Sequence, residues 1–195
     1  ICLETRKIEE MKLLCPWLSF SRMPASTPAM GTEPPPQARP KHPWVGLVVL
    51  ILVCFIAAGI GSTATTPKIG DWYAGLTKPS WNPPDAIFGP VWTLLYLAMA
   101  VAAWLVWRPG GWRGARGPLT LFAVQLVLNT LWSFLFFGLE NPGLAFAELL
   151  LLWIAILTTT VAFWFRSRLA ACLFVPYLVW VTFAGILNFT IWRMN

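Results

Sequence analysis

Charged residues are scarce in this sequence, and their scarcity excludes an ordinary soluble protein. They make up 11% of the 195 residues, whereas soluble domains carry about 25%. Hydrophobic residues account for 57%, and so much apolar surface needs a solvent other than water. We therefore expect an integral membrane protein.

The residues of common catalytic and metal sites are also few. The one histidine, His42, precedes the first long apolar run, and no Ser–His–acid set, zinc motif or glycine-rich phosphate loop is present. The four cysteines, Cys2, Cys15, Cys54 and Cys172, show no metal-ligand spacing. We therefore expect neither a metal site nor a disulfide, and an enzyme only if its chemistry needs no acid–base residues.

The net charge of +6 does not indicate nucleic-acid binding. The basic residues are scattered over short segments, without a basic helix face or an aromatic RNA-binding motif. In membrane proteins the loops with most basic residues stay in the cytoplasm, which here predicts a cytoplasmic N-terminus and cytoplasmic second and fourth loops. One side carries Arg39, Lys41, Arg108, Arg113, Arg116, Arg166 and Arg168, and the other carries Lys68, Lys78 and Arg193.

Five long apolar runs follow a leader of different composition. As a helix, each run is long enough to cross about 30 Å of hydrocarbon, and backbone groups in lipid must bond within their own segment. The predicted fold class is an all-α membrane protein, a bundle of five transmembrane helices; a soluble all-α core is the disfavoured alternative. The runs cover residues 44–63, 86–107, 118–139, 142–165 and 169–192.

The leader, residues 1–43, mixes acidic and basic residues with the proline-rich stretch 33–36. Such a composition cannot build an apolar core. We interpret it as disordered and not necessarily native, with Met30 as a plausible true start. The remainder, residues 44–195, is the membrane domain.

The first connection, residues 65–84, is much longer than the others. A connection of about 20 residues is usually functional or disordered. This one contains Trp72, Tyr73, Trp81 and several prolines, which argue against disorder. Two hypotheses follow: the connection is a lid over a binding site, or it only packs on the end of the bundle.

Polar and aromatic residues recur at helical spacing inside three of the spans. Residues three or four positions apart share one face of a helix, and buried amides in lipid need partners in neighbouring helices. These stripes either hold the helices together or line a cavity with aromatic walls, and three of them in one small bundle favour a cavity. They are Trp92 and Tyr96; Gln125, Asn129, Trp132 and Ser133; and Tyr177, Trp180, Ala184 and Asn188.

Glu148 is the one ionisable residue within a span. An acid inside a membrane is a functional candidate by default. The structural alternative is that it pairs with a backbone N–H or with a base such as Lys78.

The segment Trp72–Pro84, with the sequence WYAGLTKPSWNPP, resembles the first-loop signature of the TspO/translocator protein family. The members of this family are also called tryptophan-rich sensory proteins or peripheral-type benzodiazepine receptors. The resemblance covers about residues 44–195. It continues through residues 90–96, 125–129, 136–138, 147–150 and 176–180.

The resemblance implies a five-helix bundle that binds porphyrins or haem-type tetrapyrroles, cholesterol-like lipids and benzodiazepine-type ligands in a pocket beneath the first loop. It implies no obligatory cofactor, and it matches Trp92 and Trp180 to tryptophans linked to light-dependent porphyrin breakdown. Other expected partners are membrane lipid and a second copy of the chain, in a bacterial membrane or alternatively the mitochondrial outer membrane. With the stripes, the predicted ligand-binding residues are Trp72, Trp81, Trp92, Tyr96, Asn129, Trp132, Tyr177, Trp180 and Ala184.

One position departs from the animal members of the family. Their cholesterol motif has a tyrosine where this chain has Phe189, which weakens the case for cholesterol. Three functions remain open: a sensory protein that binds porphyrins, a transporter of porphyrins or sterol-like lipids, and a light-dependent porphyrin-degrading protein.

Overall fold

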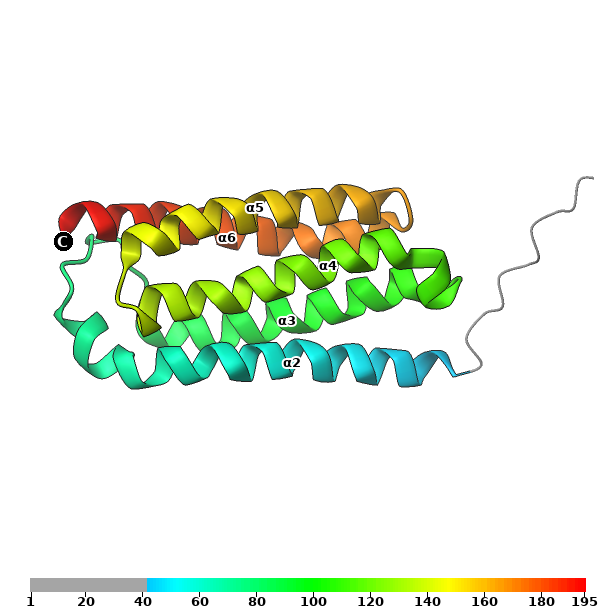
Figure 1. Cartoon of the computed structure of the whole chain (residues 1–195), viewed down its shortest axis with the longest axis horizontal. Helices are drawn as coiled ribbons and strands as arrows, with labels where there is room; N and C mark the ends of the chain where they lie inside the picture. Colours follow the sequence, from blue (N-terminus) through cyan, green and yellow to red (C-terminus); the bar gives the residue numbers. More distant parts are fainter. Residues whose placement is uncertain (1–41) are drawn as a thin grey trace, which may run out of the picture. The chain divides into compact units, whose positions relative to one another are not determined.

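The computed structural model describes residues 42–195, which are helical apart from short connections (Figure 1). Of the predicted leader, residues 1–43, all but the last two lie outside the described residues. Five helices are long and apolar enough to cross a membrane, which confirms the predicted integral, multi-pass bundle. They are α2 (Pro43–Lys68), α3 (Asp85–Trp107), α4 (Gly111–Ser133), α5 (Pro142–Trp164) and α6 (Arg168–Met194), and short π-helical turns extend α2 as η1 (Ile69–Tyr73) and α4 as η2 (Phe134–Gly138).

The helices run side by side and alternate in direction (Figure 1). Helix α5 packs on its two sequence neighbours, α4 and α6. Helix α3 packs on its neighbour α2 and also on α6, which is distant in the sequence. Side-chain oxygens satisfy free N–H groups where two helices begin: Asn141 accepts from the N–H of Leu144 at 2.9 Å, and Ser167 from that of Ala170 at 3.3 Å. These caps fix where α5 and α6 start.

The first connection is shorter than the sequence predicts. The helical backbone runs on through Gly75, so the non-helical part is only residues 76–84. Trp72 and Tyr73 explain the extension, because their rings pack against Phe136 and Phe137 of η2, with centroids 5.4 to 6.3 Å apart. Burying these rings holds the chain in a helix beyond Pro67, which lacks the N–H that a helix interior uses.

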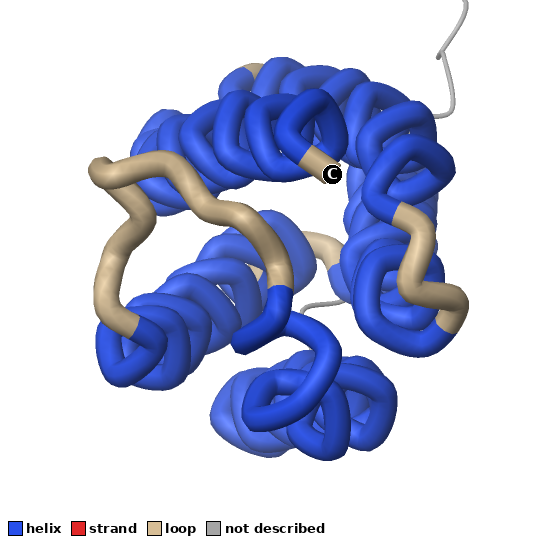
Figure 2. Tube along the Cα trace, turned by 90° about the vertical axis from the view of Figure 1, so that its left-hand side faces the viewer, coloured by secondary structure: helices blue, strands red, loops and turns tan. Residues whose placement is uncertain are grey.

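The remaining loop, residues 76–84, is attached to the end of α6 (Figure 2). The N–H of Thr77 donates to Asn195 Oδ1 at 2.9 Å, and Asn195 Nδ2 donates to the Thr77 carbonyl at 3.0 Å. The Trp81 ring contacts Phe183, with centroids 6.0 Å apart. The loop therefore has its own docking site at the C-terminal end of the bundle.

Helix α4 begins earlier than predicted. The sequence places its start at Pro118, but the helix starts at Gly111, whose φ of 61° is freely available only to glycine. The backbone departs from helical angles at Ala115 (φ −127°, ψ 19°). The predicted span thus follows this kink, and Arg113 lies in the preceding helical turns instead of in a loop.

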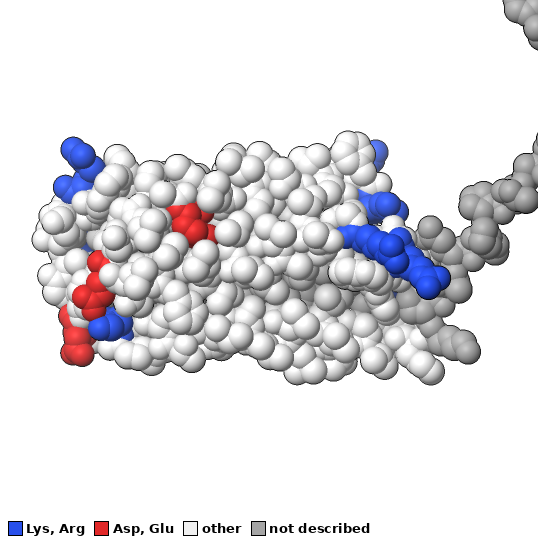
Figure 3. Space-filling model, in the orientation of Figure 1, with Lys and Arg blue, Asp and Glu red and all other residues white. Residues whose placement is uncertain are grey.

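Charged side chains gather mainly at the two ends of the bundle (Figure 3). The end where α3 meets α4 and α5 meets α6 carries arginines, whereas the first-loop end carries both signs. At that mixed end Lys68 Nζ lies 2.7 Å from Glu140 Oε1, in an exposed pair. The described basic residues at the two ends belong to the two groups on which the prediction of a cytoplasmic N-terminus rests; which end faces the cytoplasm stays a prediction.

Candidate functional site

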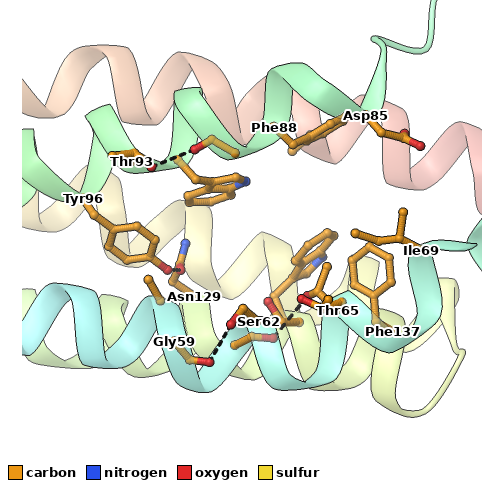
Figure 4. A pocket seen from close by; sticks show the side chains of 18 of the residues that line it. Gly59, Ser62, Thr65, Ile69, Asp85, Phe88, Thr93, Tyr96, Asn129 and Phe137 are labelled. Carbon is orange, nitrogen blue, oxygen red and sulfur yellow. Dashed lines mark hydrogen bonds between the residues drawn. The ribbon is translucent and has the colours of Figure 1, made fainter.

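A cavity of about 680 Å³ lies between the loop-side halves of α2 and α3, with α4 and α6 behind it (Figure 4). Its volume is typical of sites for drug-sized ligands, about 300–1,000 Å³. Its walls are mostly apolar and aromatic. The lining residues are Phe55, Ala58, Gly59, Gly61, Ser62, Thr65, Thr66, Ile69, Tyr73, Asp85, Ala86, Phe88, Gly89, Trp92, Thr93, Tyr96, Asn129, Trp132, Ser133, Phe137, Trp180 and Ala184.

A hydrogen-bonded chain across three helices closes the deep end of the cavity. The Tyr96 hydroxyl donates to Asn129 Oδ1, and Asn129 Nδ2 donates to the Tyr177 hydroxyl at 2.8 Å. Figure 4 shows Tyr96 and Asn129 facing each other at this end. Asn129 thus performs both predicted roles, because it ties α3 to α6 and also lines the cavity.

Two tryptophans of the wall differ in how their indole N–H groups are used. Trp132 Nε1 donates to Asn188 Oδ1 at 3.1 Å, and its ring stacks on Phe136 at 5.1 Å. Trp180 packs against Phe88 and Phe183, with centroids 5.8 and 5.5 Å away, but its buried Nε1 has no hydrogen-bond partner within residues 42–195. A buried donor without a partner is costly.

The hydroxyl groups of the cavity wall mostly bond to their own helices. Ser62 Oγ donates to the Gly59 carbonyl at 2.8 Å, and Thr93 Oγ1 to the Gly89 carbonyl at 2.9 Å. Of the residues that line the cavity, Asp85 alone is an acidic or basic residue, and it lies at the end opposite Tyr96 (Figure 4). The wall of the site is therefore mainly apolar. In the described part of the chain, no cluster of three potential metal ligands occurs.

The sequence profile of the TspO/MBR family matches residues 48–193. The chain belongs to this family.

Similar proteins of the TspO/MBR family come from distant organisms. The tryptophan-rich protein TspO of Chlorobaculum tepidum is 45% identical over 152 residues, which are 76% of this chain and 95% of that protein. The translocator protein of Homo sapiens is 43% identical over 155 residues, 78% of this chain and 92% of the human protein. The tryptophan-rich sensory protein of Cereibacter sphaeroides is 40% identical over 148 residues, 74% and 91%.

Six of the nine predicted ligand-binding residues of this TspO/MBR protein line the cavity: Trp92, Tyr96, Asn129, Trp132, Trp180 and Ala184. Trp72, Trp81 and Tyr177 do not line it. Trp72 packs on Phe136 and Phe137, and Trp81 lies in the loop with 45% of its surface exposed. Tyr177 is fully buried behind Trp92, whose ring centroid is 6.2 Å away.

The wall contributed by α2 was not predicted from the sequence. Gly59, Ser62, Thr66 and Ile69 follow one another at spacings of three and four and line the cavity together, which is one face of a helix. Small residues at this spacing also occur where helices pack closely. The pattern alone therefore did not separate a cavity wall from a packing face.

Glu148 lies outside the cavity wall and has neither of its predicted partners. It is buried, and both carboxylate oxygens lack a hydrogen-bond partner among residues 42–195. Lys78 instead places its Nζ 4.4 Å from the centroid of the Tyr73 ring. The structure leaves Glu148 as a buried acid next to the site rather than in it.

Proposed function

We propose that this TspO/MBR protein binds a porphyrin-type tetrapyrrole in the cavity between α2 and α3 and acts as a membrane sensory or regulatory protein. The observation that carries the proposal is the set of three indole rings, Trp92, Trp132 and Trp180, on the wall of one cavity. Flat aromatic rings stack on indoles, and stacking of a nucleobase on an aromatic side chain contributes about 1–3 kcal/mol.

The polar groups support the same ligand class. Within the described residues no Lys, Arg or His lines the cavity, so its interior matches the apolar ring system of a porphyrin better than a compact anion. The Trp180 Nε1 is buried without a partner among residues 42–195, so a rotation of the ring would let it donate to an acceptor on the ligand. The sensory role is proposed by analogy with the relative named a tryptophan-rich sensory protein.

The test is a titration of the purified protein in lipid nanodiscs with protoporphyrin IX, followed by quenching of tryptophan fluorescence. We expect saturable, one-site quenching. Trp180→Ala and Trp92→Ala should each weaken binding roughly 5- to 140-fold, which corresponds to about 1–3 kcal/mol of lost stacking. Trp112→Ala is the matched control, because Trp112 is 55% exposed and lies off the cavity.

Two outcomes would contradict the proposal. Quenching that rises linearly with porphyrin would indicate only partition into lipid. Equal affinities of the parent, the two cavity variants and the control would show that these indoles pack the core and do not contact the ligand.

A further inference from the structure

We infer that the ligand enters the cavity sideways from the bilayer, through an opening between α2 and α3, and not past the first loop. This inference rests on the proposed function, because it concerns the route to the proposed porphyrin site. The expected entrant is a flat, apolar molecule dissolved in the lipid. We call this opening the α2–α3 slot and define it by Gly59, Ser62, Thr66, Gly89 and Thr93.

All five slot residues line the cavity and are also exposed at the protein surface. On two neighbouring helices, such exposed lining residues are the ones expected at an open side of the cavity. The slot residues come from two helices only, and both helices are membrane spans. The outside that they face is therefore lipid.

The slot lies within the hydrocarbon layer. Thr93 is eight residues beyond Asp85, the first residue of α3, which is about 12 Å along the helix axis. Gly59, the deepest slot residue, is 14 residues before Tyr73, where the span that begins with α2 ends, which is about 21 Å along the axis. Both depths are smaller than the hydrocarbon thickness of about 30 Å. The slot thus opens into the hydrocarbon layer.

The space beside the slot glycines is empty. A Cβ atom built on Gly59 or on Gly89 would meet no atom within 4 Å, whereas one built on Gly46, nearer the other end of α2, would lie 2.3 Å from the Trp107 ring. Neither slot glycine therefore packs against another part of the chain, whereas α2 and α3 are in close contact near Gly46.

The first loop itself forms no wall of the cavity, although Ile69, Asp85 and Ala86, in the helical segments on either side of it, line the cavity and are exposed. None of residues 76–84 lines the cavity, and the loop is attached to α6 through Asn195 and through the contact of Trp81 with Phe183. The Tyr73 hydroxyl also donates to Asn82 Oδ1 at 3.2 Å. Entry past this loop would have to break these contacts, whereas entry through the slot breaks none of them.

The first experiment closes the slot reversibly. In a protein whose native cysteines have been replaced, Ser62→Cys is modified with a bulky thiosulfonate reagent, and the rate of protoporphyrin IX transfer from lipid vesicles is measured. We expect the modification to lower the association rate of the porphyrin at least tenfold, and the rate to recover when dithiothreitol removes the bulky group from the cysteine. Thr158→Cys, exposed on α5 and away from the cavity, should give no change when modified in the same way.

A loop variant distinguishes the two routes. Asn195→Ala removes both hydrogen bonds between the loop and α6, and we expect it to leave the association rate unchanged. An association rate that rises with Asn195→Ala and stays constant when Ser62→Cys is modified would overturn the inference in favour of the loop.

A second experiment needs no porphyrin. Ser62→Cys and Thr93→Cys should react with a membrane-soluble maleimide and stay unmodified by a charged, water-soluble one. Reaction with the charged reagent alone would place these residues in water and refute a lipid-facing slot. Absence of saturable porphyrin binding by the parent protein would instead refute the proposed function, and this labelling result would still decide whether the slot faces lipid.

Discussion

Replacement of Asn129 by leucine tests whether the hydrogen-bonded chain at the deep end of the cavity stabilises the bundle. The substitution keeps the volume of the side chain but deprives the Tyr96 and Tyr177 hydroxyls of their partner. An unsatisfied buried group costs about 1–3 kcal/mol, whereas interhelical hydrogen bonds in a membrane average only about 0.6 kcal/mol. How deeply each hydroxyl is buried decides which of the two free-energy costs applies to it.

Tyr177 is 0% exposed, so its hydroxyl cannot find another partner and should cost the higher value. Tyr96 lines the cavity, so its hydroxyl has space to turn toward another partner, and it should cost the lower value. We therefore expect Asn129→Leu to lower the free energy of unfolding by about 2–3 kcal/mol. Adding Tyr177→Phe should recover about half of this loss, because it removes the orphaned hydroxyl.

The assay is equilibrium unfolding in mixed micelles with increasing dodecyl sulfate, followed by circular dichroism. Gln125→Leu is the control: this buried amide lies one helical turn away, and its only hydrogen-bond contact among residues 42–195 is a weak one, from Nε2 to Met99 Sδ at 3.8 Å. It should be neutral or stabilising. If Asn129→Leu costs no more than Gln125→Leu, or if the double variant is less stable than the single one, the reasoning is refuted.

Three further predictions concern the acid, the sidedness and the light-dependent chemistry. Glu148→Leu should raise the free energy of unfolding by about 1–3 kcal/mol in the same assay, because it removes a buried group without partners; a loss of porphyrin binding would instead show a functional role. Ser80→Cys and Gly114→Cys should react with an impermeant reagent from opposite sides of intact cells, with Ser80→Cys labelled from outside, and the reverse would refute the charge count. If the protein degrades porphyrin in light, Trp92→Phe and Trp180→Phe should keep most of the binding but slow the loss of porphyrin absorbance under illumination, since phenylalanine stacks but is harder to oxidise than tryptophan; equal bleaching in parent and variants would exclude these rings as electron donors.

The five spans were predictable from the sequence because lipid imposes a simple rule. Each segment must be apolar over about 30 Å and must satisfy its own backbone, so length and hydropathy suffice without knowledge of any neighbour. The end of α2 was not predictable in this way. Its extension through Tyr73 depends on Phe136 and Phe137, which lie more than 60 positions away in the chain.

Some residues of the cavity wall could likewise be predicted from the sequence, and others could not. Trp92, Asn129 and Trp180 could be found because a buried amide in lipid needs a partner in a neighbouring helix, and because polar and aromatic residues recur at helical spacing in three spans at once. Gly59 and Ser62 could not, since a small residue has the same pattern whether it admits a ligand or a neighbouring helix. Only the empty space measured beside Gly59 separates these cases.

The distribution of polar bonds indicates which part of the site is rigid and which can move. Three helices are joined by buried side-chain hydrogen bonds, through the chain from Tyr96 through Asn129 to Tyr177 and through the bond from Trp132 to Asn188. No side chain of α2 takes part in these buried bonds; α2 is held through backbone carbonyls, with Trp104 Nε1 donating to the Pro43 carbonyl at 2.8 Å and Thr130 Oγ1 to the Ala57 carbonyl at 3.4 Å. Its only buried residues are Cys54 and Gly61. Local stability follows buried contacts, so the part of α2 along the slot should separate from the bundle at lower cost than α3, α4 or α6. A ligand that enters through the α2–α3 slot would therefore displace the least firmly held wall of the cavity and leave the three indole rings in place.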